Sequence, residues 1–189
     1  MTVIKSFLIA LGGNLPSSAG SPADTLRAAL EALAAGGAEV HAVSPFYATP
    51  CFPAGAGPDY VNAAAELRMA GDARQMLDLL HRVEGIFGRE RVQRWGRRTL
   101  DLDLIAQGQT VLPDRATHAA WRDLPLDDQM TRAPDDVILP HPRVQDRAFV
   151  LIPLADIAPD WRHPVLGLTV REMVRAVPPD TVAEVVRLS

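Results

Sequence analysis

The alternating segment from Thr99 to Ala106 restricts the fold of this chain more than any other stretch. Leucines fill positions 100, 102 and 104, and Asp101 and Asp103 lie between them. In a β-strand, successive side chains point to opposite faces, so the leucines would share one face and both carboxylates the other. Aspartate is disfavoured in strands, and two aspartates on one face repel unless a cation or water separates them. The pattern predicts a half-buried strand with one apolar and one acidic face.

The elements expected before this strand define the fold class. Ile4 to Leu11 is a nearly continuous apolar run, as expected for a strand covered on both faces. Capping and stop signals predict two helices, one between Ser21 and Gly36 and one from Asp72, with Gln75 as its capping-box partner, to Gly88. Strands are expected at 39–47 and 60–69, joined by a long loop rich in proline and glycine. The order β-α-β-β-α-β predicts an α+β, ferredoxin-like fold with an antiparallel sheet.

Beyond this core the sequence is less regular. Gln107 to Val137 has no strong hydrophobic period, and we expect a long excursion that is either functional or mobile. Ala148 to Ile157 is apolar and predicts a helix, Thr169 with Glu172 begins a short one, and Glu184 to Leu188 is expected as a short edge strand. Residues 1–189 are therefore expected to form a single domain with an excursion at about 107–137.

Composition excludes several classes of protein. Cys51 is the only cysteine, which excludes an internal disulfide and a cysteine-based zinc cluster and favours a reducing, cytoplasmic location. The longest apolar run, Phe7 to Leu11, is too short to span a membrane. The formal net charge is −4 and the pI about 5.7, so general attraction to nucleic acid or to anionic membranes is not indicated.

Positive charge is nevertheless concentrated in residues 82–98, which we call the arginine island. It contains six arginines and two glutamates, a local charge of +4: Arg82, Arg89, Arg91, Arg94, Arg97 and Arg98 against Glu84 and Glu90. Such an island can be a solvated face or a nucleic-acid patch. Because it lies directly before the strand with two carboxylates, it favours phosphoryl transfer, in which arginines neutralise a triphosphate and the carboxylates hold Mg²⁺. Gly88 and Gly96 suit a movable loop, although Gly88 can equally be a helix stop.

Three smaller features leave structural and functional interpretations open. Gly12-Gly13-Asn14 has the spacing of neither a P-loop nor a dinucleotide fingerprint, and we interpret it as a strand-to-loop turn that uses positive φ. Tyr60 and Asn62 share a strand face that would suit a flat heterocycle, or they belong to the core and an edge. His141 lies between two prolines and is either a ligand or a structural histidine. Three other histidines and two tryptophans are expected in packing or at the surface: His41, His118, His163, Trp121 and Trp161.

Four segments together resemble the 6-hydroxymethyl-7,8-dihydropterin pyrophosphokinase family over roughly residues 3 to 160. They are Pro45–Pro50, Asp59–Asn62, Arg94–Leu104 and Leu139–Arg143, of which the Trp-Gly-x-Arg-Thr-Leu-Asp-Leu-Asp run is the most specific. The resemblance implies transfer of the terminal pyrophosphoryl unit of ATP to a reduced pterin, giving AMP and the pterin diphosphate of folate synthesis. It implies two Mg²⁺ ions bound by Asp101 and Asp103, and no protein nucleophile.

The resemblance also assigns roles to individual residues. As catalytic residues it implies Arg89, Arg98, Asp101 and Asp103. Contacts to ATP are implied for Glu84, Arg91, Trp95, Arg98, His141 and Arg147. Contacts to the pterin are implied for Thr49, Pro50, Phe52, Tyr60, Asn62, Trp95 and Phe149, with Tyr60 and Phe149 on either side of the ring. The implied partners are ATP and the pterin, with no nucleic acid or membrane, and a monomer is expected.

The sequence departs from the family pattern at several positions. Arg97 stands where the family usually has proline, Phe52 replaces an aliphatic residue, and His81 stands where glutamine is common. The excursion is about twenty residues longer than is typical. Two alternative functions are an RNA- or DNA-binding module, which the net charge disfavours, and a metal-dependent phosphohydrolase with water as the acceptor.

Overall fold

An antiparallel sheet forms the centre of the computed structural model, which describes residues 3–51, 57–88, 99–125, 128 and 131–189. The strands are β1 (Ile4–Gly13), β2 (Glu39–Val43), β3 (Tyr47–Thr49), β4 (Tyr60–Ala70), β5 (Asp101–Gln107) and β6 (Val186–Arg187). Their order in the sheet is β5-β1-β4-β3-β6, and β2 also pairs with β4. The predicted α+β class with an antiparallel, ferredoxin-like arrangement is confirmed, and β6 is the expected edge strand.

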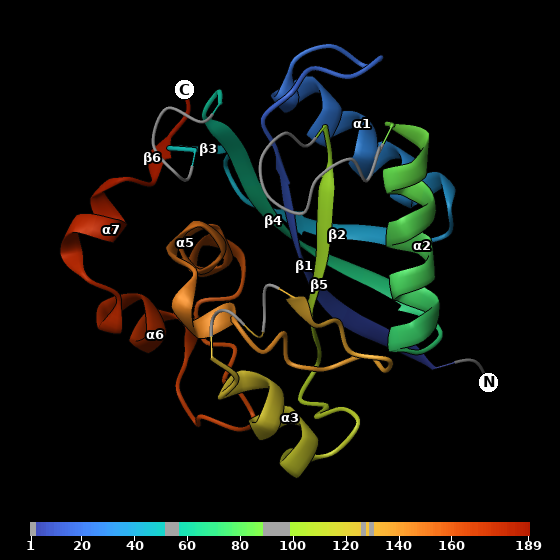
Figure 1. Ribbon diagram of the computed structural model, residues 1–189. Helices are drawn as coiled ribbons and strands as arrows, with labels where there is room; N and C mark the ends of the chain where they lie inside the picture. Colours follow the sequence, from blue (N-terminus) through green and yellow to red (C-terminus); the bar gives the residue numbers. More distant parts are fainter. Residues whose placement is uncertain (1–2, 52–56, 89–98, 126–127, 129–130) are drawn as a thin grey trace.

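Helices cover both faces of this sheet (Figure 1). The helices are α1 (Pro22–Ala35), α2 (Ala73–Ile86), α3 (Arg115–Arg122), α5 (Ala148–Ile157), α6 (Val170–Ala176) and α7 (Pro179–Ala183). On one side lie α1 and α2, on the other α5 and α6, while α3 lies near one end of the sheet. The capping boxes predicted for α2 and α6 are both present, and α1 also begins with one. Gly88, at φ +77, follows the C-cap residue Phe87 of α2 and is the helix stop.

The central strand β1 contributes to two hydrophobic clusters. Phe7, Ile9 and Leu11 pack with α1 and α2, whereas Leu8 and Ala10 pack with α5 and α6. The prediction that this strand is covered on both faces is therefore confirmed. The alternation in β5 is confirmed in the same way, because Leu100, Leu102 and Leu104 join the cluster under α1 and α2. Asp101 and Asp103 consequently lie on the face that α5 covers, and both remain partly exposed.

Three sequence-based expectations were wrong in detail. The strand expected at 39–47 is divided into β2 and β3, because Pro45 has no N–H for the ladder and the Ser44 hydroxyl accepts a bond from the Ala64 N–H at 2.9 Å. Gly12 and Gly13 continue β1 instead of forming a turn, and neither has a positive φ. The excursion, in which no helix was predicted because it has no strong hydrophobic period, contains α3, whose N-terminus is capped by Asp114.

The missed helix has a simple explanation. The sole buried residue of α3 is His118, so the helix has no apolar stripe for a periodicity analysis to detect. None of the described helices is both long enough and apolar enough to cross a membrane.

Candidate active site

One row of residues crosses the sheet on the face covered by α5. Asp101 of β5 is opposite Gly12 of β1, Gly12 is opposite Asn62 of β4, and Asn62 is opposite Tyr47 of β3. Neighbouring strands are about 4.8 Å apart, so Asp101 and Asn62 start about 10 Å from each other. The sheet therefore places a carboxylate and an amide, 39 positions apart in the sequence, at two ends of one short surface.

The amide of Asn62 is fixed by two neighbours. Its Nδ2 donates to Thr49 Oγ1 at 2.7 Å in a buried hydrogen bond. Its Oδ1 lies over Gly12, where a Cβ atom would come within 2.9 Å of that oxygen. Gly12 is thus required for the close approach of Asn62 and not for an unusual backbone angle. The sequence-based interpretation of Gly12 missed this role, since the two residues meet only through strand pairing.

Tyr47, next to Asn62 in the row, ties the sheet to α5. Its hydroxyl donates to Asp156 Oδ2 at 2.7 Å, and the side chain is largely buried. Burial, with the bond to Asp156 second, raises the pKa of Tyr47 to about 12. Neither Tyr47 nor Asp156 was among the predicted site residues, although Tyr47 lies within the Pro45–Pro50 motif.

A second group of side chains joins β5 to the start of α5. Arg147 Nη1 lies 3.3 Å from Asp103 Oδ2, and both side chains are about one-third exposed. The Arg147 guanidinium also lies 5.8 Å from the centre of the Phe149 ring. Phe149 is 40% exposed. The structure therefore brings together a predicted metal ligand, a predicted ATP contact and a predicted pterin contact.

His141 is held next to the same strand. Its backbone N–H donates to the carbonyl of Ile105 at 2.8 Å, and its Nδ1 accepts from the Arg143 N–H at 3.1 Å. The neutral ring consequently carries its hydrogen on Nε2, which is a donor suited to a phosphate oxygen. Desolvation, followed by the charge of Arg147, lowers the pKa of His141 to about 3, while Asp101 opposes the shift.

Glu84 occupies a different position from the other predicted ATP contacts. It is 1% exposed, and its Oε1 accepts from the backbone N–H of Leu102 at 2.8 Å. Leu102 lies between Asp101 and Asp103, so α2 holds the edge of the strand that carries both carboxylates. A sequence signal existed, because Glu84 falls on the apolar face of α2 beside Leu80 and Val83.

Of the remaining predicted site residues, some belong to the described part of the chain and others do not. Tyr60 begins β4 and is half-buried, and Pro50 is exposed after β3 beside the buried Cys51. Five predicted site residues lie outside the described residues: Phe52, Arg89, Arg91, Trp95 and Arg98. Arg97, the departure from the family pattern, also lies outside them.

The donor set at Asp101 and Asp103 fits Mg²⁺. Among the described residues there is no group of three or more histidine, cysteine, aspartate or glutamate side chains that could enclose a metal. Magnesium is commonly held by one or two carboxylates and completes its coordination with water and substrate phosphates. Two partly exposed carboxylates on one strand face provide this kind of site.

Fold and site together define a class of enzyme. A ferredoxin-like sheet that presents two carboxylates, an arginine and a neutral imidazole near one another can hold a metal–nucleotide complex against a second substrate, as phosphoryl-type transferases do.

Comparison with known proteins narrows this class to one family. The model of the family "7,8-dihydro-6-hydroxymethylpterin-pyrophosphokinase (HPPK)" matches residues 8–159. The 2-amino-4-hydroxy-6-hydroxymethyldihydropteridine pyrophosphokinase of Synechocystis sp. is 37% identical over 171 residues, covering 90% of this chain and 75% of the relative. That of Pseudomonas aeruginosa is 36% identical over 177 residues, covering 93% and 94%. The chain belongs to the HPPK family: it is a diphosphotransferase that catalyses the pyrophosphokinase step of folate biosynthesis.

Solved structures agree on the fold. The HPPK-DHPS protein of Plasmodium falciparum superimposes with a TM-score of 0.62 at 13% sequence identity. The match covers 93% of this chain but only 45% of that longer chain, and at this identity it supports the fold alone.

Proposed function

We propose that Asp101 and Asp103 hold two Mg²⁺ ions, and that the strand face around them binds ATP and 6-hydroxymethyl-7,8-dihydropterin. The observation that carries this proposal is the row Asp101, Gly12 and Asn62, which sets a metal-binding carboxylate about two strands from a buried, oriented amide. A bicyclic ring read by the amide can extend its hydroxymethyl group toward the carboxylates across this surface.

On the ATP side, Arg147 and His141 are the described residues that contact phosphate. Arg147 offers a planar fork of donors, and neutral His141 offers Nε2–H. Four residues of the arginine island complete the site as the resemblance implies: Arg89, Arg91, Trp95 and Arg98. Glu84 acts on this site through β5, since its carboxylate is bonded to Leu102.

On the pterin side, Asn62 supplies hydrogen bonds to the polar edge of the ring. The bond to Thr49 occupies one amide hydrogen and fixes which way the amide faces. Tyr60 and Phe149 lie on β4 and α5, which pack against each other, and provide the two aromatic faces. Thr49 and Pro50 line this pocket as the resemblance implies, and the contact implied for Phe52 lies outside the described residues.

Catalysis depends on position and charge, and no side chain acts as a nucleophile. When bound, Mg²⁺ would polarise the phosphate oxygens and favour the alkoxide-like form of the pterin hydroxymethyl group. Arg147 balances the charge of Asp103 in the absence of substrate and can turn to the phosphates when they arrive. His141 stays neutral at physiological pH because its pKa is low, so it donates one hydrogen bond without adding charge.

The test is AMP formation from Mg-ATP and the pterin by Asp101→Asn and Asp103→Asn. Loss of either carboxylate should lower turnover by about a thousandfold or more, because metal binding carries several kcal/mol of transition-state stabilisation. Asp78→Asn, which changes an exposed carboxylate of α2, is the matched control. Near-normal turnover in both site variants would refute the metal assignment, and ATP loss without pterin would indicate a phosphohydrolase.

The protein is further proposed to act as a monomer in the cytoplasm. Both sheet faces are covered by its own helices, and the thiol of Cys51 is buried and unpaired. Light scattering coupled to gel filtration tests the first point, and a stable dimer at micromolar concentration would overturn it.

A further inference from the structure

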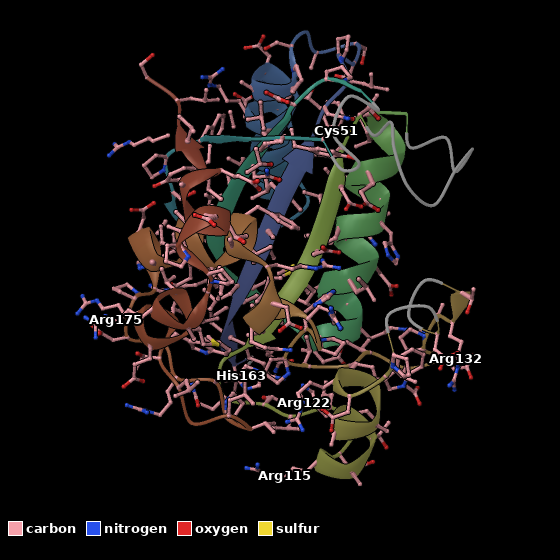
Figure 2. All side chains as sticks on the ribbon, turned by 60° about the vertical axis from the view of Figure 1, so that its left-hand side comes forward. Cys51, Arg115, Arg122, Arg132, His163 and Arg175 are labelled. Carbon is pink, nitrogen blue, oxygen red and sulfur yellow. The ribbon has the colours of Figure 1, made fainter. Side chains whose placement is uncertain are left out.

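Two buried histidines lie outside the site described above. His118 of α3 and His163, between α5 and α6, have no exposed surface. Their rings pack edge to face with centres 5.8 Å apart, and the Trp161 ring packs on His163 at the same separation. Figure 2 shows His163 and Arg122, the last residue of α3, toward the end of the molecule opposite Cys51. No pattern in the sequence connects these residues, yet they form one cluster.

Hydrogen bonds define the neutral tautomer of both rings. His163 Nδ1 accepts from the backbone N–H groups of Val165 and Leu166, each at 3.2 Å, so its hydrogen is on Nε2. His118 Nε2 lies 2.9 Å from the carbonyl of Pro140, which can only accept, so His118 also carries its hydrogen on Nε2. Within the described part of the chain, the two other ring nitrogens have no hydrogen-bond partner. In the neutral rings, His163 Nε2 is a donor and His118 Nδ1 is an acceptor, so the two nitrogens have complementary character.

The carbonyl that His118 binds belongs to the peptide unit leading into His141. The N–H of this same unit donates to Ile105 of β5. Since a peptide unit is planar and rigid, holding its oxygen and its N–H together fixes its orientation. One residue earlier, Leu139 exchanges two backbone hydrogen bonds with Leu112, at 2.9 and 3.2 Å. The segment presenting His141 is thus clamped between β5 and the excursion.

We propose that His118, supported by His163, is a positioning residue for ATP: by holding the Pro140 carbonyl, it fixes the His141 ring toward the phosphates. The proposal rests on the role proposed above for His141. It also gives the excursion a function in this protein, because α3 supplies the donor that completes the clamp. His118 itself has no exposed surface and is not expected to touch the substrate.

Steady-state kinetics of His118→Leu test the proposal. The KM for ATP should rise about tenfold, the effect of roughly one lost hydrogen bond, while kcat and the KM for pterin stay within about twofold. His118→Gln, whose terminal amide can still donate to Pro140, should restore the KM for ATP. His118→Asn has a shorter side chain and should raise the KM for ATP as His118→Leu does. His41→Leu is the control, because His41 is exposed on β2. An unchanged KM for ATP in folded His118→Leu or His118→Asn overturns the proposal.

A comparison with His141→Ala separates this proposal from the function on which it rests. If His141→Ala leaves the KM for ATP unchanged, the proposed contact of His141 with phosphate is wrong. If His141→Ala raises it and folded His118→Leu does not, only the positioning role is wrong. If the phosphate contact of His141 and the positioning role of His118 are both right, the variant carrying His118→Leu and His141→Ala should have the same KM for ATP as His141→Ala alone, because the two residues act through one contact.

Nitrogen-15 NMR of the unmodified enzyme gives a test that does not depend on folding of a variant. Both His118 and His163 should be neutral with hydrogen on Nε2 at pH 7. Hydrogen on Nδ1 of His118 would remove the donor to Pro140 and overturn the proposal.

Discussion

Replacing Gly12 by alanine tests how the sheet orients the amide of Asn62. A Cβ atom on residue 12 would lie 2.9 Å from Asn62 Oδ1, and ordinary contact begins near 3.4 Å. The amide must therefore move by about half an ångström. Asn62 is only 5% exposed, and its Nδ2 is committed to Thr49 at 2.7 Å, so it cannot move without weakening that bond.

The size of the effect follows from these contacts. Overpacking a closed site costs about 1–3 kcal/mol, and a weakened buried hydrogen bond costs about 1 kcal/mol. The two costs do not add in full, because moving the amide relieves part of the overpacking. We expect the free energy of unfolding to fall by about 2 kcal/mol and the Tm by about 4–8 °C. A displaced amide no longer matches the polar edge of the pterin, so the KM for pterin should rise about 10- to 100-fold.

The assay is the initial rate of AMP formation with pterin and ATP varied separately, together with thermal unfolding. The KM for ATP should change little, because the new methyl group meets Asn62 and Val61 and no atom of Asp101 within 4 Å. Gly85→Ala is the matched control: a Cβ at Gly85 in α2 meets nothing within 4 Å, and alanine is the better helix former.

Two outcomes would refute this reasoning. An unchanged Tm for Gly12→Ala would mean that the close approach of Asn62 is not required. A lower Tm with an unchanged KM for pterin would mean that Asn62 does not read the substrate.

Two further predictions concern buried polar groups. Glu84→Leu should lower the free energy of unfolding by about 1–3 kcal/mol and reduce kcat, because the Leu102 N–H loses its acceptor. Glu84→Gln retains an acceptor oxygen and should lose less stability and less activity. An equal loss in both variants would exclude this hydrogen bond as the cause. Burial, aided by the charges of His118 and Arg122, lowers the pKa of His163 to about 4. As the pH falls, the imidazole of residue 163 therefore gains a proton in the unfolded chain before it does so in the folded protein. The stability that is present above pH 6.5 is lost as the pH falls toward 4. Between pH 7 and pH 5 this linkage lowers the free energy of unfolding by about 2 kcal/mol. In urea unfolding, the free energy of unfolding of His163→Gln should therefore depend less steeply on pH than that of the unmodified protein. Identical slopes in the two proteins would contradict this prediction. The pKa of His118 is lowered too, chiefly by burial, with Arg122 acting in the same direction and Asp123 and the Pro140 carbonyl opposing it, so part of the slope should remain.

Local patterns in the sequence predicted most of the fold. The alternation of leucine and aspartate in β5 fixes which side chains share a face, whatever the strand packs against. The capping boxes at Asp72 and Thr169 involve residues three positions apart, so they form wherever a helix starts. Where a single helix buried an unusual residue, such as His118 of α3, the same approach failed.

The candidate site was predictable in its chemistry but only partly in its construction. Asp101, Asp103, Asn62, His141 and Arg147 were identified from motifs, and the structure brings Asp103 to Arg147 and Asp101 into the row with Asn62. The supporting contacts were not predicted. Gly12 was interpreted as a turn, and Glu84 was predicted as an ATP contact with no indication of its bond to Leu102, because the partners of both residues are distant in the sequence.

By itself, then, the sequence determined the periodicities, the helix ends and the types of functional group available. Only the tertiary structure decided which groups meet: Asn62 lies over Gly12, Glu84 holds Leu102, and His118 holds Pro140. Period and capping arise from bonds between residues a few positions apart. These side-chain contacts depend on strand register and on packing between elements. A shift of one residue in register would place each side chain of a strand on the opposite face of the sheet.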